Sequence, residues 1–228
     1  MAQTYSSRTR TAHPKFRNVA VPAAILIAVN VALMFLVAQT PLAAVNDLLF
    51  STPILGLIVF GAALTGGNVL AERGLERGQV AVAGVGIVLL QGAYAVFGGG
   101  ILARVPQASQ GVALGVTLVV TVAMTIAVAG YVYVRDRDFD HWNKWALGAF
   151  VIGAVLVLVG SFVTDLALLG GFLFIFLGFM FRLGYEIWRV RASYDPDRSL
   201  IHALGIYVAF TGVFVHVLQI VARMMADR

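Results

Sequence analysis

Four ionisable side chains lie within long apolar stretches near the end of this sequence, between positions 172 and 225. They are Arg182, Glu186, His202 and His216. A titratable side chain at membrane depth is costly, so it usually faces a bundle interior or a water-filled cavity and marks an ion or proton pathway. The sequence therefore places its candidate functional site in this segment.

The first two of these residues form a candidate charge pair. Arg182 and Glu186 are four positions apart, so they lie on one face of a helix within reach of each other. Pairing offsets part of the cost of burying each charge. Alternatively, Glu186 marks the end of the helix and Arg182 extends toward the membrane surface. Spacing alone leaves both interpretations open.

A second pattern is a small or polar stripe along the last apolar stretch. Taking every third or fourth residue gives His202, Gly205, Ala209, Gly212, His216, Gln219 and Arg223. A helix with such a stripe turns it toward other helices or water, away from lipid. The stripe is thus either a close-packed seam or the lining of a wet pathway. At 1.5 Å per residue the two histidines are about 21 Å apart along the helix, so they cannot share one metal ion.

The stretches that carry these residues are long enough to span a membrane. The chain of 228 residues is 60% hydrophobic and 12% charged, with a mean hydropathy of +0.90. A spanning helix needs about 20 mostly apolar residues. Seven segments qualify: residues 19–40, 53–71, 80–102, 111–134, 142–163, 166–187 and 200–222. The sequence predicts an all-α integral membrane protein, a seven-transmembrane-helix bundle in residues 19–226 that follows a cytoplasmic tail of residues 1–18.

Basic residues in the short links predict how the bundle is oriented. Of the 16 Lys and Arg residues, 12 fall on the N-terminal side of the membrane, three fall on the other side, and Arg182 lies within a span. Cytoplasmic loops are enriched in Lys and Arg. We therefore expect a cytoplasmic N-terminus, an outside C-terminus and location in the cell (inner or plasma) membrane. Because the net charge of +5 resides in these loops, the expected partner is the lipid bilayer, and no nucleic acid is expected.

Three segments resemble the Bax inhibitor-1 family, the transmembrane Bax inhibitor motif proteins. The run YEIWRV is similar to the family's Tyr-Asp-Thr-like end of the sixth helix, with Tyr185 and Glu186 at the matching positions. The run HALGIYVAFTGVFVHVLQIVARMM is similar to the seventh helix, and its matching residues are Ala203, Leu204, Tyr207, Phe210 and Phe214. Upstream, Asp138 and Phe139 match a Lys-Arg-Asp-Phe segment. The resemblance covers residues 111–225 well.

This resemblance implies a seven-helix bundle whose last helix is central and is wrapped by the other six. Some bacterial members are similar to pH-sensitive calcium leak proteins, in which aspartates on the sixth and seventh helices share a proton and close the pore. Here Glu186 keeps the first carboxylate, but Ala209 stands at the second position. The shared-proton contact therefore cannot form as in the family. We expect Arg182 to hold Glu186 ionised instead, which lowers its sensitivity to mild acid.

Two functional hypotheses of different classes follow. The first is a passive leak for calcium or another cation, with Glu186 as the attracting or gating carboxylate and Arg182 as its counter-charge. The pathway would then be lined by the seventh-helix stripe and the matching tyrosines: His202, His216, Ala209, Tyr185 and Tyr207. The second is a non-conducting regulator that binds a membrane-protein partner, such as a protease or a stress-response protein.

Catalytic, cofactor and metal sites are not expected. The only lysines, Lys15 and Lys144, lie outside the spans, so the last helix has no Schiff-base lysine for retinal. A His-Glu-x-x-His motif is absent, Ser161 lacks a nucleophile elbow, and the chain has no cysteine. We therefore expect that the protein is not an enzyme. Further polar residues in or near spans are expected to form interhelical hydrogen bonds: Asn30, Asn68, Gln91 and Asp165.

Overall fold

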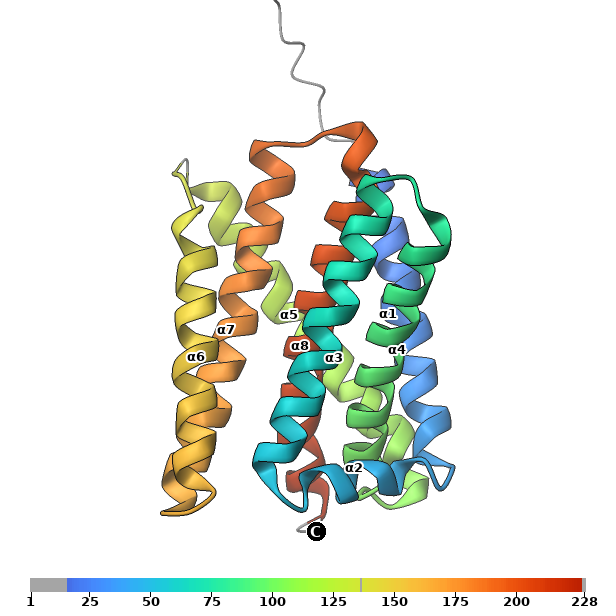
Figure 1. Ribbon diagram of the computed structural model, residues 1–228, viewed down its shortest axis with the longest axis vertical. Coiled ribbons are helices and arrows are strands. Elements are labelled where there is room, and N and C mark those ends of the chain that lie inside the picture. The colour runs from blue at the N-terminus through green and yellow to red at the C-terminus, as the bar shows by residue number, and fades with distance from the viewer. Residues whose placement is uncertain (1–15, 136, 227–228) are drawn as a thin grey trace, which may run out of the picture.

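Long helices make up nearly all of the structure, a computed structural model that describes residues 16–135 and 137–226. Seven helices in these ranges are long and apolar enough to cross a membrane. They are α1 (Phe16–Ala38), α3 (Pro53–Glu76), α4 (Val80–Leu102), α5 (Gln110–Val134), α6 (His141–Gly160), α7 (Asp165–Ala192) and α8 (Ser199–Ala226) (Figure 1). The described ranges contain no strand. The prediction of a seven-helix integral membrane protein is confirmed. Most of the predicted tail, residues 1–15, lies outside the described residues.

The link between the first two spans contains an additional short helix, α2 (Ala43–Phe50). Its segment AAVNDLLF has helix-forming residues and an apolar face, but it is too short to read as a span. Figure 1 shows α2 lying across one end of the bundle, which we call the α2 end. The short 3-10 helix η1 (Gln107–Ser109) follows α4 at this end. A second one, η2 (Pro196–Arg198), joins α7 to α8 at the opposite end, the η2 end.

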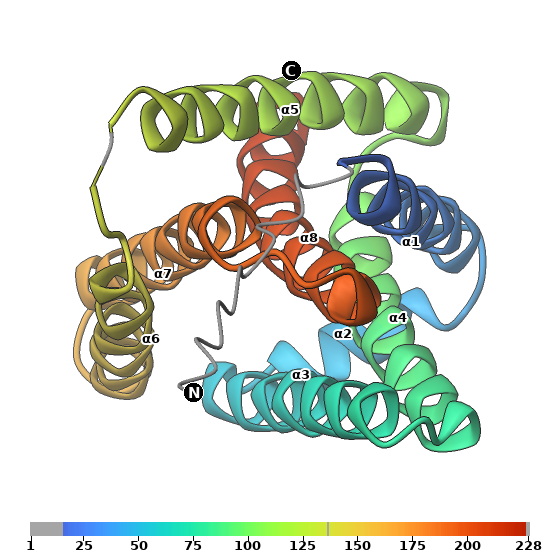
Figure 2. The same cartoon turned by 90° about the horizontal axis from the view of Figure 1, so that it is seen from above.

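The last helix, α8, lies in the centre of the bundle (Figure 2). In its spanning window 72% of the residues are buried, against 17% to 33% in the other six helices. It packs against α1, α3, α4, α5 and α7, whereas α6 packs mainly on the outer side of α7. The side chains of Tyr207, Phe214 and Leu218 on α8 are almost completely enclosed. The expectation of a central last helix is therefore confirmed.

The α6–α7 hairpin is held together by a close approach of the two backbones. Gly153 on α6 and Gly171 on α7 face each other, and a Cβ atom built on either would lie about 3 Å from the carbonyl oxygen of the other. Small residues at such positions let membrane helices pack closely. This packing stabilises the helix pair, because the hydrophobic effect does not drive helices together within lipid. This seam fixes the position of α7, which carries the candidate site.

Candidate functional site

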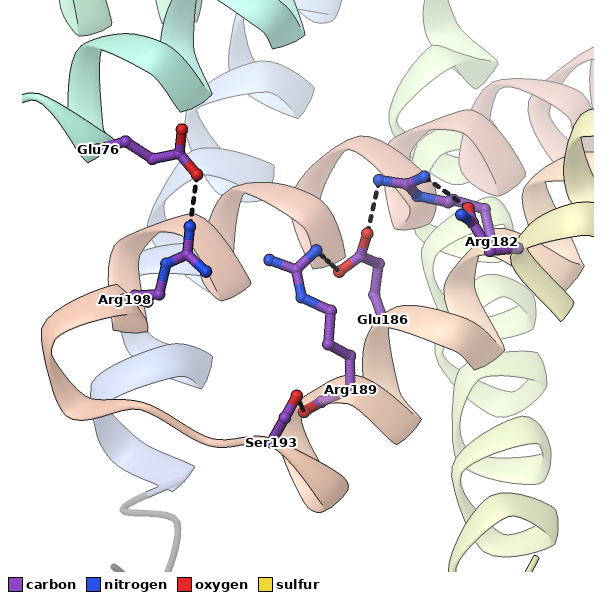
Figure 3. Close-up of polar contacts among 7 residues, drawn as sticks. Glu76, Arg182, Glu186, Arg189, Ser193 and Arg198 are labelled. Carbon is purple, nitrogen blue, oxygen red and sulfur yellow. Dashed lines mark hydrogen bonds and ion pairs between the residues drawn. The ribbon is translucent and has the colours of Figure 1, made fainter. Parts of the chain in front are cut away.

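The carboxylate of Glu186 is completely buried and lies between two guanidinium groups of its own helix (Figure 3). Nη2 of Arg182 is 2.7 Å from Oε1, and Nη1 of Arg189 is 3.4 Å from Oε2. The spacings of four and three residues place both arginines on the face of α7 that carries Glu186. The structure therefore brings the predicted pair together and adds Arg189 to it.

Arg182 is held by further contacts besides its ion pair. Its Nη1 donates a hydrogen bond of 3.0 Å to Oδ1 of Asn143, near the start of α6. Its guanidinium carbon lies 5.6 Å from the centre of the Tyr185 ring, which is a cation–π distance. Arg182 thus points into this group of contacts, and α6 takes part in positioning it. Asn143 carried no spacing signal in the sequence, because it belongs to a different helix.

The opposite wall of the site is the backbone of α8 at Gly205. A Cβ atom built there would lie 2.5 Å from Oε2 of Glu186, so a glycine is needed for this close approach. Ala209, the predicted position of the missing aspartate, is fully buried one turn further along α8. The carboxylate therefore meets α8 at Gly205, a member of the predicted stripe.

The middle of the stripe on α8 packs against aromatic rings of α7. A Cβ atom at Gly212 would overlap the ring of Phe179. The His216 ring lies 5.0 to 6.0 Å from the rings of Phe172, Phe176 and Phe179, and its Nδ1 is 2.7 Å from the carbonyl oxygen of Gly212. These contacts match the close-packed seam, one of the two interpretations of the stripe. They place His216 in an apolar cage, apart from the Glu186 group.

His202 begins the stripe at the η2 end and has a different environment. It is 2% exposed, and its ring stacks on that of Tyr194 at a centroid distance of 6.3 Å. Among the described residues, neither ring nitrogen has a hydrogen-bond partner, and the Tyr194 hydroxyl has none either. This part of α8 therefore offers buried polar atoms that the protein itself does not satisfy.

A separate polar cluster joins α1, α4 and α8. Nδ2 of Asn30 donates to Oε1 of Gln91 at 2.6 Å and to the Tyr207 hydroxyl at 3.4 Å. Nε2 of Gln91 donates back to the carbonyl oxygen of Leu26 at 3.0 Å. The expected interhelical hydrogen bonds of Asn30 and Gln91 are confirmed. Tyr207 of α8 is thereby held in a cluster with residues of α1 and α4. Helix α7, which carries Glu186, takes no part in this cluster.

An exposed ion pair lies at the η2 end, near the site. Nη2 of Arg198 in η2 lies 2.5 Å from Oε1 of Glu76 at the end of α3 (Figure 3). Its partners are about half exposed, so the pair adds little stability on its own. It nevertheless ties the link between α7 and α8 to the end of α3.

Comparison with known families matches this chain over residues 16–227 to the family described as "Inhibitor of apoptosis-promoting Bax1". The chain belongs to the Bax inhibitor-1 family. The match includes the first helices, which the motifs of residues 111–225 did not reach. Comparisons with curated proteins and with solved structures gave no match. In this Bax inhibitor-1 family protein, the buried carboxylate lies on the helix whose Tyr-Glu pair carried the resemblance.

Proposed function

We propose that this Bax inhibitor-1 family protein is a passive cation leak, for calcium in the first place, and that Glu186 is its gating carboxylate. The observation that supports the proposal is the fully buried carboxylate held between two guanidinium groups where α7 meets α8. Carboxylates attract cations in selective pathways. A guanidinium in contact with the carboxylate repels an approaching cation. The arrangement corresponds to a closed gate.

Opening then requires the guanidinium groups to leave the carboxylate. Arg182 is also bonded to Asn143 of α6, so a shift of α6 along α7 changes its position. Arg189 lies near the end of α7, where the link through η2 is tied to α3 by the Arg198–Glu76 pair. The proposed gate is therefore in contact with α6 through Asn143 and is linked through η2 to α3.

A calcium-dye assay in proteoliposomes tests the gate with two variants of opposite expected effect. Arg182→Gln removes a repelling charge and keeps the carboxylate, so calcium flux should rise. Glu186→Gln leaves two unpaired guanidinium groups, so flux should fall below that of the unaltered protein. A barrier change of about 1.4 kcal/mol corresponds to about a tenfold change in rate. Arg104→Gln is the matched control, because Arg104 pairs with Asp47 at an exposed site in the α2 end.

A further variant separates gating from misfolding. Breaking a buried ion pair costs about 3–5 kcal/mol of folding stability, so Arg182→Gln must first be shown to fold. It should elute as a single species in size-exclusion chromatography and keep the helical circular dichroism spectrum of the unaltered protein. Arg182→Lys keeps the charge and should keep the low flux. Equal flux in the unaltered protein, Arg182→Gln, Glu186→Gln and empty liposomes would contradict the proposal.

A second candidate function is a non-conducting regulator that binds a membrane protease or a stress-response protein. It is favoured by the packing of the α8 stripe, where Phe179 and His216 fill the space beside Gly212. Two guanidinium groups also contact a single carboxylate, and their excess positive charge disfavours a cation at this site as long as the contacts persist. For both candidate functions, we propose that the protein is not an enzyme. The absence of flux from every variant would support this second function.

A further inference from the structure

A lateral pocket lies between α2, α3 and α4, and no residue of the Glu186 group lines it. The cavity measures about 350 Å³, within the range of about 300–1,000 Å³ that is typical of ligand pockets. Its walls are almost entirely apolar. One wall is aromatic, with ring centres of Phe97 5.0 Å from Phe50 and 4.7 Å from Phe60.

The shape of the pocket follows the direction of the spanning helices. Its lining on α4 extends from Val88 to Phe97, about 13 Å along the axis at 1.5 Å per residue. Val88 is 71% exposed and Val59 on α3 is 40% exposed, so this side of the pocket faces out of the bundle. Apolar side chains exposed on spanning helices face lipid hydrocarbon. The pocket is therefore a lengthwise slot open to the membrane interior, a shape that suits a hydrocarbon chain.

Asn46 of α2 is the one polar side chain among the described residues that line the slot. It is 2% exposed, it packs against Gly100 of α4, and its Oδ1 has no hydrogen-bond partner in the described part of the chain. A buried acceptor without a donor keeps its full desolvation penalty. Asn46 therefore brings a buried, unsatisfied acceptor to the wall of the slot.

The depth of Asn46 matches that of a lipid head group. The next residue, Asp47, is 64% exposed and pairs with the exposed Arg104 at 2.7 Å. On the same short helix, the apolar Leu48 is 70% exposed. A helix with exposed charged and exposed apolar residues side by side suits the boundary between water and hydrocarbon. From these neighbours we infer that Asn46 lies at the level of the lipid head groups, with the rest of the slot deeper in the membrane.

We propose that this slot binds a neutral membrane lipid with a free head-group hydroxyl. One acyl chain lies along α4 against the aromatic wall, and the hydroxyl donates a hydrogen bond to Oδ1 of Asn46. A neutral lipid fits because, of the residues that the structure describes, no charged side chain lines the slot. The site is independent of the proposed ion gate.

Photolabelling in phosphatidylcholine vesicles tests the site with the whole protein. The probe is a monoacylglycerol that carries a diazirine in its acyl chain. After irradiation, label should concentrate in residues 88–97 of α4 and should fall about tenfold in Gly92→Phe. Gly92 lines the slot, and a Cβ atom there meets no atom within 4 Å, so a phenyl ring enters the slot without displacing backbone. Gly84→Phe is the matched control, because Gly84 has equal space on α4 but does not line the slot.

A second probe tests the hydrogen bond. The methyl ester of the same diazirine chain has no hydroxyl, so it should label the slot about tenfold less than the monoacylglycerol does. Asn46→Leu should abolish this preference for the monoacylglycerol. Label spread evenly over all lipid-facing helices, or unchanged in Gly92→Phe, would overturn the proposed site. Equal labelling by the two probes in the unaltered protein would overturn the role of Asn46.

Discussion

Two helices contribute to the site of Glu186 in different ways. Both of its charge partners, Arg182 and Arg189, belong to α7, so a movement of α7 carries the carboxylate and both guanidinium groups together. From α8, Gly205 contributes space. Substitutions of Arg182 and Arg189 should therefore act through charge, and those at Gly205 through volume. This difference allows the two effects to be measured separately.

Gly205→Ala should destabilise the protein without altering any charge. The added methyl group meets the carboxylate of Glu186 at 2.5 Å, and overpacking of this kind costs about 1–3 kcal/mol. The measurement is the thermal melting temperature in detergent, which should fall. Gly115→Ala on α5 is the control, because its Cβ meets nothing within 4 Å and should leave the melting temperature unchanged or raised. A Gly205→Ala variant as stable as Gly115→Ala would contradict this account.

The sequence predicted the part of the site that depends on spacing within one helix. The four-residue step from Arg182 to Glu186 offered their pairing as one of two interpretations, and the structure contains the pair. It does not predict Asn143, 39 positions from Arg182, because that contact depends on how α6 and α7 are rotated about their axes. The cage of His216 was missed for the same reason, since its rings come from the neighbouring helix.

At the scale of elements, hydropathy predicted the seven spans but not α2. A span is recognisable because its apolar residues continue for the thickness of a membrane. The eight residues of α2 have no such length, and the burial of Asn46 depends on Gly100, a residue of another helix. The α6–α7 seam of Gly153 and Gly171 was not predicted either, because it depends on which faces of two helices meet.

Gly171→Leu should separate α6 from α7 and loosen the Asn143–Arg182 hydrogen bond. Its side chain would meet Val157 and the carbonyl oxygen of Gly153 on α6, so strain of at least about 1–3 kcal/mol is expected. Equilibrium unfolding in a denaturing detergent measures the loss. The adjacent Gly170→Leu is the control, because the nearest atom to its Cβ is a flexible Leu156 side chain at 3.4 Å. Equal losses in the two variants would argue against the seam.

For the whole molecule, charge is distributed unevenly between the two ends. Among the described residues outside the α7 interior, the basic residues at the α2 end are Arg104 and Arg223. Those at the η2 end are Arg17, Arg73, Arg77, Arg135, Arg137, Lys144, Arg189, Arg191 and Arg198. Positively charged ends remain in the cytoplasm during insertion. We therefore propose that the η2 end is cytoplasmic.

The absence of cysteine makes this orientation directly measurable. Ser51→Cys at the α2 end and Ser193→Cys at the η2 end are matched substitutions at exposed positions. In intact cells, a membrane-impermeant maleimide should label Ser51→Cys. It should label Ser193→Cys only after the cells are permeabilised. The reverse pattern would show that the charge distribution has been misinterpreted.

The central position of α8 also has a consequence for how the protein is made. Because a chain is synthesised from its N-terminus, α8, against which five others pack, leaves the ribosome after the other six spanning helices described above. Until then, α1, α3, α4, α5 and α7 have no partner for their inner faces. Tyr207, which joins the Asn30–Gln91 pair, and Gly205, which faces Glu186, both belong to α8, so these contacts form only after α8 is inserted. The core of the bundle is therefore completed only after α8 is inserted, and chains that lack α8 should be substrates for membrane quality control.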